Sequence, residues 1–254
     1  MKRLAVGLPG WSLGYAIVLE MMLVAAILYW PNFEENIGAL RILAAPIPAM
    51  RVLLEQVESF GVVGYVSGQH FFKGCNTMGA AAAVLFAVGA VAGEARRGTL
   101  EIWMARPFSR LRMLSERYAT GAVALAFPIF ATSATIPWLC GFVDESVPLW
   151  AMMLSSVHQW IFLMTIYSAT FLASTRGSHP TRISLAAIFS VTFLFAMYMV
   201  EVVTNYSFFR LADIEDHMFI FEHATLDWPI IALLVAISAA LFWLSLRSFQ
   251  RRIP

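Results

Sequence analysis

Apolar residues form long runs along this chain, and shorter polar segments separate them. A helix needs about 20 mostly apolar residues to cross roughly 30 Å of hydrocarbon. Six runs reach that length, and each is expected to be a helix because a backbone in lipid must satisfy its own hydrogen bonds. The predicted spans cover residues 11–30, 74–92, 119–142, 149–173, 183–203 and 228–246. We therefore predict an all-α polytopic membrane protein in which residues 1–254 form one transmembrane domain.

Charge is unevenly distributed between the two sides that these spans define. An even number of spans places both termini on one side, and thirteen of the seventeen Lys and Arg residues lie there. Eleven of the sixteen Asp and Glu residues lie on the opposite side. The positive-inside rule then predicts that both termini are cytoplasmic. Because membrane topology already accounts for the basic residues, nucleic acid is not an expected partner, whereas the lipid bilayer is.

Composition supports the same class, with 60% hydrophobic and only 13% charged residues. Two segments on the side opposite the termini are long enough to have structure of their own. Within residues 31–72, the pattern over 52–60 places apolar residues on one helical face and acids on the other, which predicts a short surface helix. Within residues 204–227, the apolar run 218–221 lies between acidic clusters, which favours an interfacial or re-entrant element over a free loop.

The segment between the second and third predicted spans, residues 93–117, carries six arginines; we call it the connector. Gly98 is expected to break the incoming helix, because glycine readily adopts conformations that end helices. Thr99 is expected to act as the N-cap of a short helix over about residues 98–107, and Pro107 is expected to end that helix.

The short connector helix has an apolar stripe. Leu100, Trp103 and Met104 are spaced i, i+3 and i+4, so they share one face. Ser109 then provides an expected N-cap for the helix that leads into the third span. The connector is therefore predicted to present an amphipathic helix at the membrane surface, on the side of the termini.

Three kinds of polar residue elsewhere are candidates for a role. Glu20 lies near the middle of the first span, where a charge costs about 2.5 to 3.5 kcal/mol, so it serves either a translocation pathway or a structural hydrogen bond. His217 and His223 stand among acids and are weak candidates for metal ligands, with a solvated acidic loop as the alternative. Cys75 and Cys140 lie toward the same side, where buried free thiols are favoured over a disulfide.

The order of residues in the connector resembles the cytoplasmic coupling segment of ABC-2 type transporter permeases, the membrane subunits of many bacterial ABC exporters. The pattern in that family is roughly E-x-x-x-G-T-L-E-x-L-L-x-x-P-x-S-R. The matching residues are Glu94, Gly98, Thr99, Leu100, Glu101, Pro107, Ser109 and Arg110. Trp103 departs from the pattern, which has leucine at that place. The six-span layout extends a weaker resemblance over the whole chain.

This resemblance implies a type V-like permease fold in the bacterial cytoplasmic (inner) membrane. It implies that the connector helix docks into a separate ATP-binding cassette subunit, and that the permease forms a homodimer or heterodimer. The residues then expected to contact the ATPase subunit are Glu94, Arg97, Gly98, Thr99, Leu100, Glu101, Trp103, Met104, Arg106, Pro107, Ser109 and Arg110.

The chain contains no Gly-Lys dipeptide, so it has no phosphate-binding loop of the G-x-x-x-x-G-K-[ST] type. We therefore expect no cofactor in this chain and no catalytic residues, with ATP and Mg²⁺ bound by the partner subunit. The expected function is that of a transport subunit, most simply of an exporter. The alternatives are a secondary transporter or a membrane anchor of a signalling complex, neither of which would have an ATPase partner.

Overall fold

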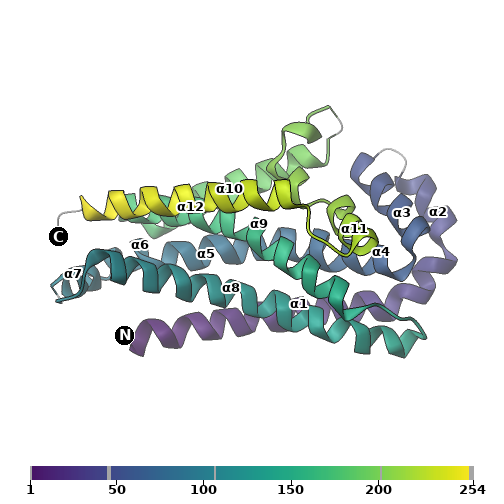
Figure 1. The fold of residues 1–254 in the computed structure, drawn as a ribbon, viewed down its shortest axis with the longest axis horizontal. Coiled ribbons are helices and arrows are strands. Elements are labelled where there is room, and N and C mark those ends of the chain that lie inside the picture. Colours follow the sequence, from purple (N-terminus) through teal and green to yellow (C-terminus); the bar gives the residue numbers. More distant parts are fainter. Residues whose placement is uncertain (1, 45–46, 106, 201, 252–254) are drawn as a thin grey trace.

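The computed structural model describes residues 2–44, 47–105, 107–200 and 202–251, and these form a bundle of long helices that run along one axis (Figure 1). No β-strand occurs within these ranges. Six helical stretches are long and apolar enough to cross a membrane, and they are Gly7–Glu35, Val62–Ala90, Arg110–Val143, Leu149–Arg176, Pro180–Tyr198 and Trp228–Gln250. The predicted all-α polytopic fold is confirmed.

Shorter helices flank or interrupt the long ones. In the first half of the chain the helices are α1 (Lys2–Glu35), α2 (Ile37–Ala44), α3 (Pro48–Phe60), α4 (Val62–Ser67), the π-helix η1 (Gly68–Gly79), α5 (Ala80–Ala90), α6 (Ala92–Arg96) and α7 (Thr99–Met104). In the second half they are α8 (Arg110–Cys140), η2 (Gly141–Val143), α9 (Leu149–Arg176), α10 (Pro180–Tyr198), η3 (Thr204–Tyr206), η4 (Phe208–Ala212), α11 (Ile214–His223) and α12 (Trp228–Gln250), where η2 to η4 are 3-10 helices.

The second span is longer than its hydropathy indicates. It begins at Val62, whereas the sequence predicted a start at residue 74, so residues 62–72 belong to the span and not to an external segment. Its first half contains polar side chains that break the apolar run. Ser67, His70 and Asn76 are buried against the rest of the bundle, whereas Lys73 and Thr77 are exposed. His70, for example, is hydrogen-bonded through Nε2 to Ser133 Oγ at 2.9 Å and is 1% exposed. The fifth span ends at Tyr198, five residues earlier than predicted.

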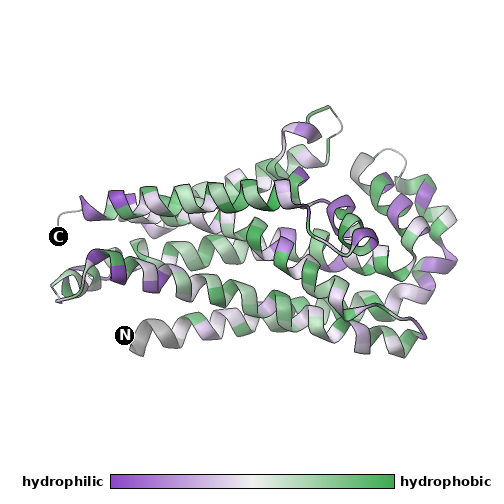
Figure 2. Ribbon diagram, viewed as in Figure 1, coloured by the Kyte–Doolittle hydropathy of each residue, from purple (hydrophilic) through white to green (hydrophobic). Residues whose placement is uncertain are grey.

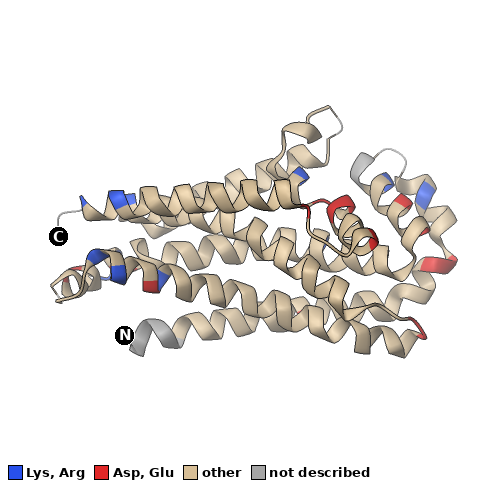
Figure 3. Ribbon diagram, in the orientation of Figure 1, with Lys and Arg blue, Asp and Glu red and all other residues tan. Residues whose placement is uncertain are grey.

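The two ends of the bundle differ in charge. Helix α1 begins and α12 ends at the same end of the bundle, which we call the terminal end, as an even number of spans requires (Figure 1). Lys and Arg gather at the terminal end, and most Asp and Glu lie at the opposite, outer end (Figure 3). Between them the helices are predominantly hydrophobic (Figure 2). The assignment of the terminal end to the cytoplasm stays a prediction.

The spans divide into an inner and an outer set. In the most apolar window of each, 72% of the residues of the second span and 61% of α9 are buried, against 6% of α10. Small residues let α5 and α9 approach closely, since Ala83 and Ala87 are fully buried. A Cβ atom on Gly79 would lie 2.7 Å from Leu163 Cδ1. This small-residue packing therefore operates within one chain.

The outer end carries the surface elements that the sequence predicted. Helix α3 is amphipathic, with Leu53 and Val57 buried and Glu55 exposed, which confirms the short helix predicted over residues 52–60. The apolar run 218–221 lies in α11, which contacts α3, α4 and α9. Among the described residues, Cys75 and Cys140 are both buried free thiols, as expected.

Candidate functional site

The connector folds into two short helices at the terminal end of the bundle, α6 and α7, which link α5 to α8 (Figure 1). Gly98 has φ +67°, a left-handed conformation that glycine adopts without strain, and it is the N-cap of α7. The prediction that Thr99 is the N-cap was wrong, because Thr99 is already the first helical residue. The helix also ends at Met104, three residues before Pro107.

A buried carboxylate organises the connector. Glu94, on α6, is 4% exposed and accepts hydrogen bonds from the Arg97 guanidinium and from the Thr99 hydroxyl. The same Thr99 hydroxyl lies 3.2 Å from the backbone oxygen of Glu94. Thr99 therefore stabilises the start of α7 by bonding back to α6, which gives the five-residue spacing between Glu94 and Thr99 a structural role in this chain.

The sequence prediction missed Arg117 as a member of this site. Arg117 is on α8 and its side chain is only 10% exposed; its guanidinium lies 4.0 Å from Glu94 Oε2. It also donates a hydrogen bond to the backbone oxygen of Ala90 and stacks on the Trp103 ring, 3.9 Å from the ring centroid. Arg117 thus joins α5, α6, α7 and α8. No local spacing links Arg117 to Glu94, so only the charge content of the connector hinted at the pair.

The apolar stripe of α7 faces the protein itself. Leu100 is 5% exposed within the main core, and Met104 is partly buried against that core. Trp103 is half-buried beneath Arg117. The large apolar side chains that the connector leaves exposed are others, Ile102, Phe108 and Leu111, which are 62%, 48% and 52% exposed.

The remaining connector residues lie at the start of α8 or on the exposed surface. Ser109 is the N-cap of α8, as predicted, and its hydroxyl accepts from the Arg112 backbone N–H at 3.2 Å. Arg110 donates to the backbone oxygen of Gln250 at 2.7 Å and so ties α8 to the end of α12. Glu101 and Pro107 are exposed. Arg106, also expected at the site, lies outside the described residues.

Glu20 makes a structural contact between two spans. Its Oε2 accepts a hydrogen bond from the Thr135 hydroxyl of α8 at 3.1 Å, and the residue is partly exposed on the surface of α1. This is the hydrogen bond to a neighbouring helix that the sequence allowed as one of two roles for Glu20. A role in translocation stays a prediction.

The two histidines proposed as weak metal ligands do not come together. His217 is buried at 1% exposure, whereas His223 is exposed and stacks on Phe219 of the same helix. Among the described residues no cluster of three or more His, Cys, Asp or Glu could hold a metal ion. His217 lies instead beside His158 of α9, with ring centroids 5.6 Å apart. Burial lowers the pKa of His217 well below its ordinary value, and the nearby histidines lower it further.

A second buried carboxylate lies at the outer end. Asp213 caps α11 and is 2% exposed; it accepts from the Tyr198 hydroxyl at 2.5 Å, from the Ile214 N–H at 2.6 Å and from Arg210. The Asp213 N–H in turn donates to Asp216 Oδ2 at 2.9 Å, which completes a capping box. Burial raises the pKa of Asp213, and these hydrogen bonds offset part of the rise.

No family model, no curated protein and no solved structure matches this chain. The connector is therefore described by its own contacts. Its short helix α7 is fixed to the ends of two spans by a buried ion-pair cluster, and the large exposed apolar side chains of the connector are Ile102, Phe108 and Leu111.

Proposed function

We propose that this chain is the permease subunit of an ABC transporter, most simply an exporter in a bacterial inner membrane, driven by a separate ATP-binding cassette subunit. The observation that carries the proposal is the connector, whose residues from Glu94 to Arg110 resemble the coupling segment of ABC-2 type permeases. The resemblance lies between the second and third spans, at the arginine-rich terminal end.

The contacts of the connector suit it to transmit force. Glu94 and Arg117 fix α7 to α6 and to α8, so a push on α7 would displace the ends of the second and third spans together. Helix α8 is in turn tied to α12 through Arg110. A partner that changes shape on ATP hydrolysis would therefore act on three spans through one short helix. The permease dimer that the resemblance implies is part of the same proposal.

The contact surface proposed for the ATPase subunit differs from the stripe that the sequence indicated. Leu100 is buried in the core, so aspartate at this position would test folding and not docking. Ile102 and Phe108 are exposed, and Glu101 is an exposed acid next to Ile102. An apolar contact flanked by charge is typical of a specific interface, because packing supplies affinity and charge fixes register.

The test is co-purification from the native membrane. The tagged chain, solubilised in mild detergent, should carry a P-loop protein and an ATPase activity. Ile102→Asp or Phe108→Asp should weaken the complex about thirtyfold or more, since burying a charge in an interface centre costs at least about 2 kcal/mol. Ile42→Asp is the matched control, because Ile42 is 77% exposed but lies at the outer end on α2.

Two results would contradict the proposal. One is a purified chain that carries no nucleotide-hydrolysing partner under conditions in which its thermal unfolding is cooperative. That result would favour a secondary transporter or a membrane anchor. The other is a complex whose affinity and ATPase activity survive both Ile102→Asp and Phe108→Asp, which would place the contact elsewhere.

A further inference from the structure

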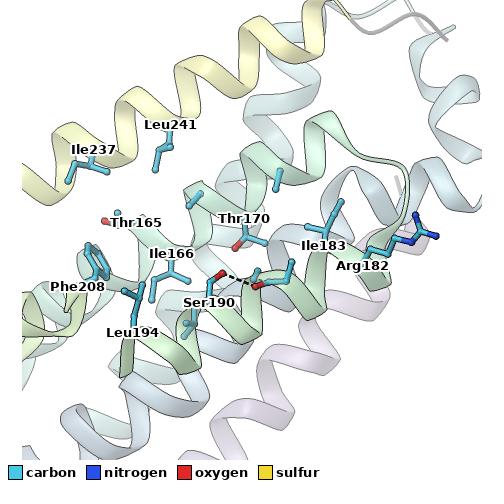
Figure 4. A pocket seen from close by; sticks show the side chains of 15 residues that line it. Thr165, Ile166, Thr170, Arg182, Ile183, Ser190, Leu194, Phe208, Ile237 and Leu241 are labelled. Carbon is cyan, nitrogen blue, oxygen red and sulfur yellow. Dashed lines mark hydrogen bonds between the residues drawn. The ribbon is translucent and has the colours of Figure 1, made fainter. Parts of the chain in front are cut away.

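A groove runs along the membrane-embedded surface between α9, α10 and α12 (Figure 4). It has a volume of about 690 Å³, within the range of about 300 to 1,000 Å³ typical of ligand pockets. Its floor includes the buried Thr165 and Thr170 of α9, and Ile237 and Leu241 of α12 form one wall. All three helices belong to candidate spans, so the groove opens toward the bilayer or toward another protein.

The lining of the groove suits hydrocarbon. Most of its residues are alanine, valine, leucine or isoleucine, and two of its three hydroxyl groups, those of Thr165 and Ser190, are bonded within the protein. Ser190 donates to the backbone oxygen of Ala186 at 2.9 Å, and Thr165 lies 3.1 Å from Ser238 Oγ (Figure 4 shows the first bond). Small side chains, such as Ala173 and Ala186, leave the space open. A polar substrate would therefore meet a mostly apolar surface with few polar partners.

The length of the groove suits one acyl chain. Along α10 it extends from Arg182 to Leu194, which at 1.5 Å per residue is about 18 Å. This is close to the depth of one leaflet, which is half of the roughly 30 Å hydrocarbon core of a bilayer. An extended alkyl chain from one leaflet can therefore lie along the groove.

One charged residue lines the groove, and it lies at the terminal end. Arg182 is exposed in the first turn of α10, and no hydrogen bond or ion pair to another described residue engages it. A second guanidinium lies at the same end of the groove, since Arg96 donates to the hydroxyl of Thr181, the residue before Arg182, at 2.9 Å. An arginine at the polar end of an apolar groove is complementary to a phosphate group on a lipid chain.

We propose that this groove is a binding site for one anionic phospholipid, with an acyl chain between α9, α10 and α12 and the phosphate on Arg182. The lipid comes from the leaflet at the terminal end, where the basic residues gather. This site does not depend on an ATPase partner, so it stands or falls separately from the proposed transport function. A bound lipid would fill the space between α10 and the rest of the bundle and so hold the most exposed span in place.

The test counts lipid on the purified full-length chain by native mass spectrometry. Phosphatidylglycerol is added at limiting concentration, and phosphatidylcholine with the same chains is the zwitterionic comparison. The wild-type chain should retain one phosphatidylglycerol. Arg182→Gln should lower its affinity about fivefold and remove the preference over phosphatidylcholine. Ala186→Phe fills the groove and should lower the affinity for both lipids at least about tenfold, because displacing two methylene groups already costs that much.

The controls separate the groove from the lipid-facing surface as a whole. Arg247→Gln removes a basic residue at the same end that stacks on Trp243 and does not line the groove. Ala239→Phe adds the same ring to an exposed position of α12 outside the groove. Neither should change lipid retention. Ser190→Leu is a second groove-filling variant, used if Ala186→Phe lowers the thermal stability of the chain.

Three results would overturn the inference. Groove-filling variants that retain lipid like the wild-type chain would place the lipid elsewhere. If Arg182→Gln still prefers phosphatidylglycerol over phosphatidylcholine as the wild-type chain does, the phosphate does not bind Arg182. If Ala186→Phe retains lipid but no longer binds a second copy of the chain, the groove is a subunit interface and not a lipid site.

Discussion

Two buried carboxylates, Glu94 at the terminal end and Asp213 at the outer end, fix short surface helices to the bundle in different ways. Glu94 meets two guanidinium groups, and that of Arg117 is itself buried. Asp213 meets one half-exposed arginine, Arg210, together with a tyrosine hydroxyl and the first N–H of its own helix. The first site is held mainly by opposite charge and the second mainly by hydrogen-bond geometry.

The difference shows what a buried acid in a membrane protein does and does not indicate. At Glu94 the charge must persist, because removing it leaves the Arg117 guanidinium in a poorly solvated place. At Asp213 burial already disfavours ionisation, and the side chain is needed for its oxygen atoms. Both acids are explained by structure alone. Neither site requires a substrate or a metal, and the comparison can be tested with amide and alanine variants.

The largest expected effect is at Glu94. Glu94→Ala should lower the free energy of unfolding by about 3 to 5 kcal/mol, since it leaves a buried charge without its partner. Glu94→Gln should cost nearly as much, because an amide does not neutralise Arg117. Thermal unfolding in detergent measures both. Glu116→Ala is the control, as Glu116 forms an exposed pair with Arg112 that is worth at most about 1 kcal/mol. A Glu94→Gln variant as stable as the wild-type chain would show that charge is not what holds α7.

A smaller effect, with the opposite response to the amide, is expected at Asp213. Asp213→Ala should cost about 2 to 3 kcal/mol, because it removes the cap of α11 and leaves the buried Tyr198 hydroxyl without its acceptor. Asp213→Asn should cost under about 1 kcal/mol, since asparagine caps helices equally well. The same unfolding assay applies. If asparagine proves as damaging as alanine, the ion pair with Arg210 is the main contact and the contrast with Glu94 disappears.

The smallest effect is a pH dependence at the outer end. Burial raises the pKa of Asp216 to about 7, and the hydrogen bond from the Asp213 N–H offsets part of the rise. Because the unfolded carboxyl ionises near pH 4, the native state holds an extra proton between about pH 4 and 7, and stability falls as pH rises through that window. The free energy of unfolding of Asp216→Asn, taken relative to that of the wild-type chain, should therefore rise by about 1 to 2 kcal/mol as pH increases from 5 to 7.

A second group on the same helix, His217, also makes stability depend on pH. His217 titrates in the opposite sense: its pKa is lowered, so its contribution is present above about pH 6.5 and is lost as pH falls. It is present in both chains and cancels in the comparison. A difference between Asp216→Asn and the wild-type chain that does not change with pH would show that Asp216 is ionised in the native state.

Several features of the fold could be predicted because they depend on local sequence. The six spans, the amphipathic α3 and the Ser109 cap all follow from periodicity or from one residue and its neighbours. The early start of the second span at Val62 could not be predicted, because its polar residues read as an external segment. His70 shows why: its Nε2 atom is hydrogen-bonded to Ser133 Oγ at 2.9 Å, and Ser133 is far along the chain.

The connector shows the same limit at the candidate site. Its composition predicted a short helix with Leu100, Trp103 and Met104 on one face, and that face exists. Periodicity says which side chains share a face. It does not say whether that face meets lipid, a partner or the chain's own core, since each of these accepts apolar residues. In the folded chain Arg117 contacts both Glu94 and Trp103, so the apolar stripe of α7 faces the bundle and Ile102 is exposed.

The sequence by itself determined that the chain is a helical membrane protein with its basic residues at one end, because hydrophobicity and charge act residue by residue. Only the tertiary structure decided which helices are inner and which are outer, where Glu94 and Asp213 find their partners, and that α9, α10 and α12 leave a groove with Arg182 at its end. These features come from contacts between residues far apart in the chain. Packing of whole helices against one another sets such contacts, and no local pattern encodes them.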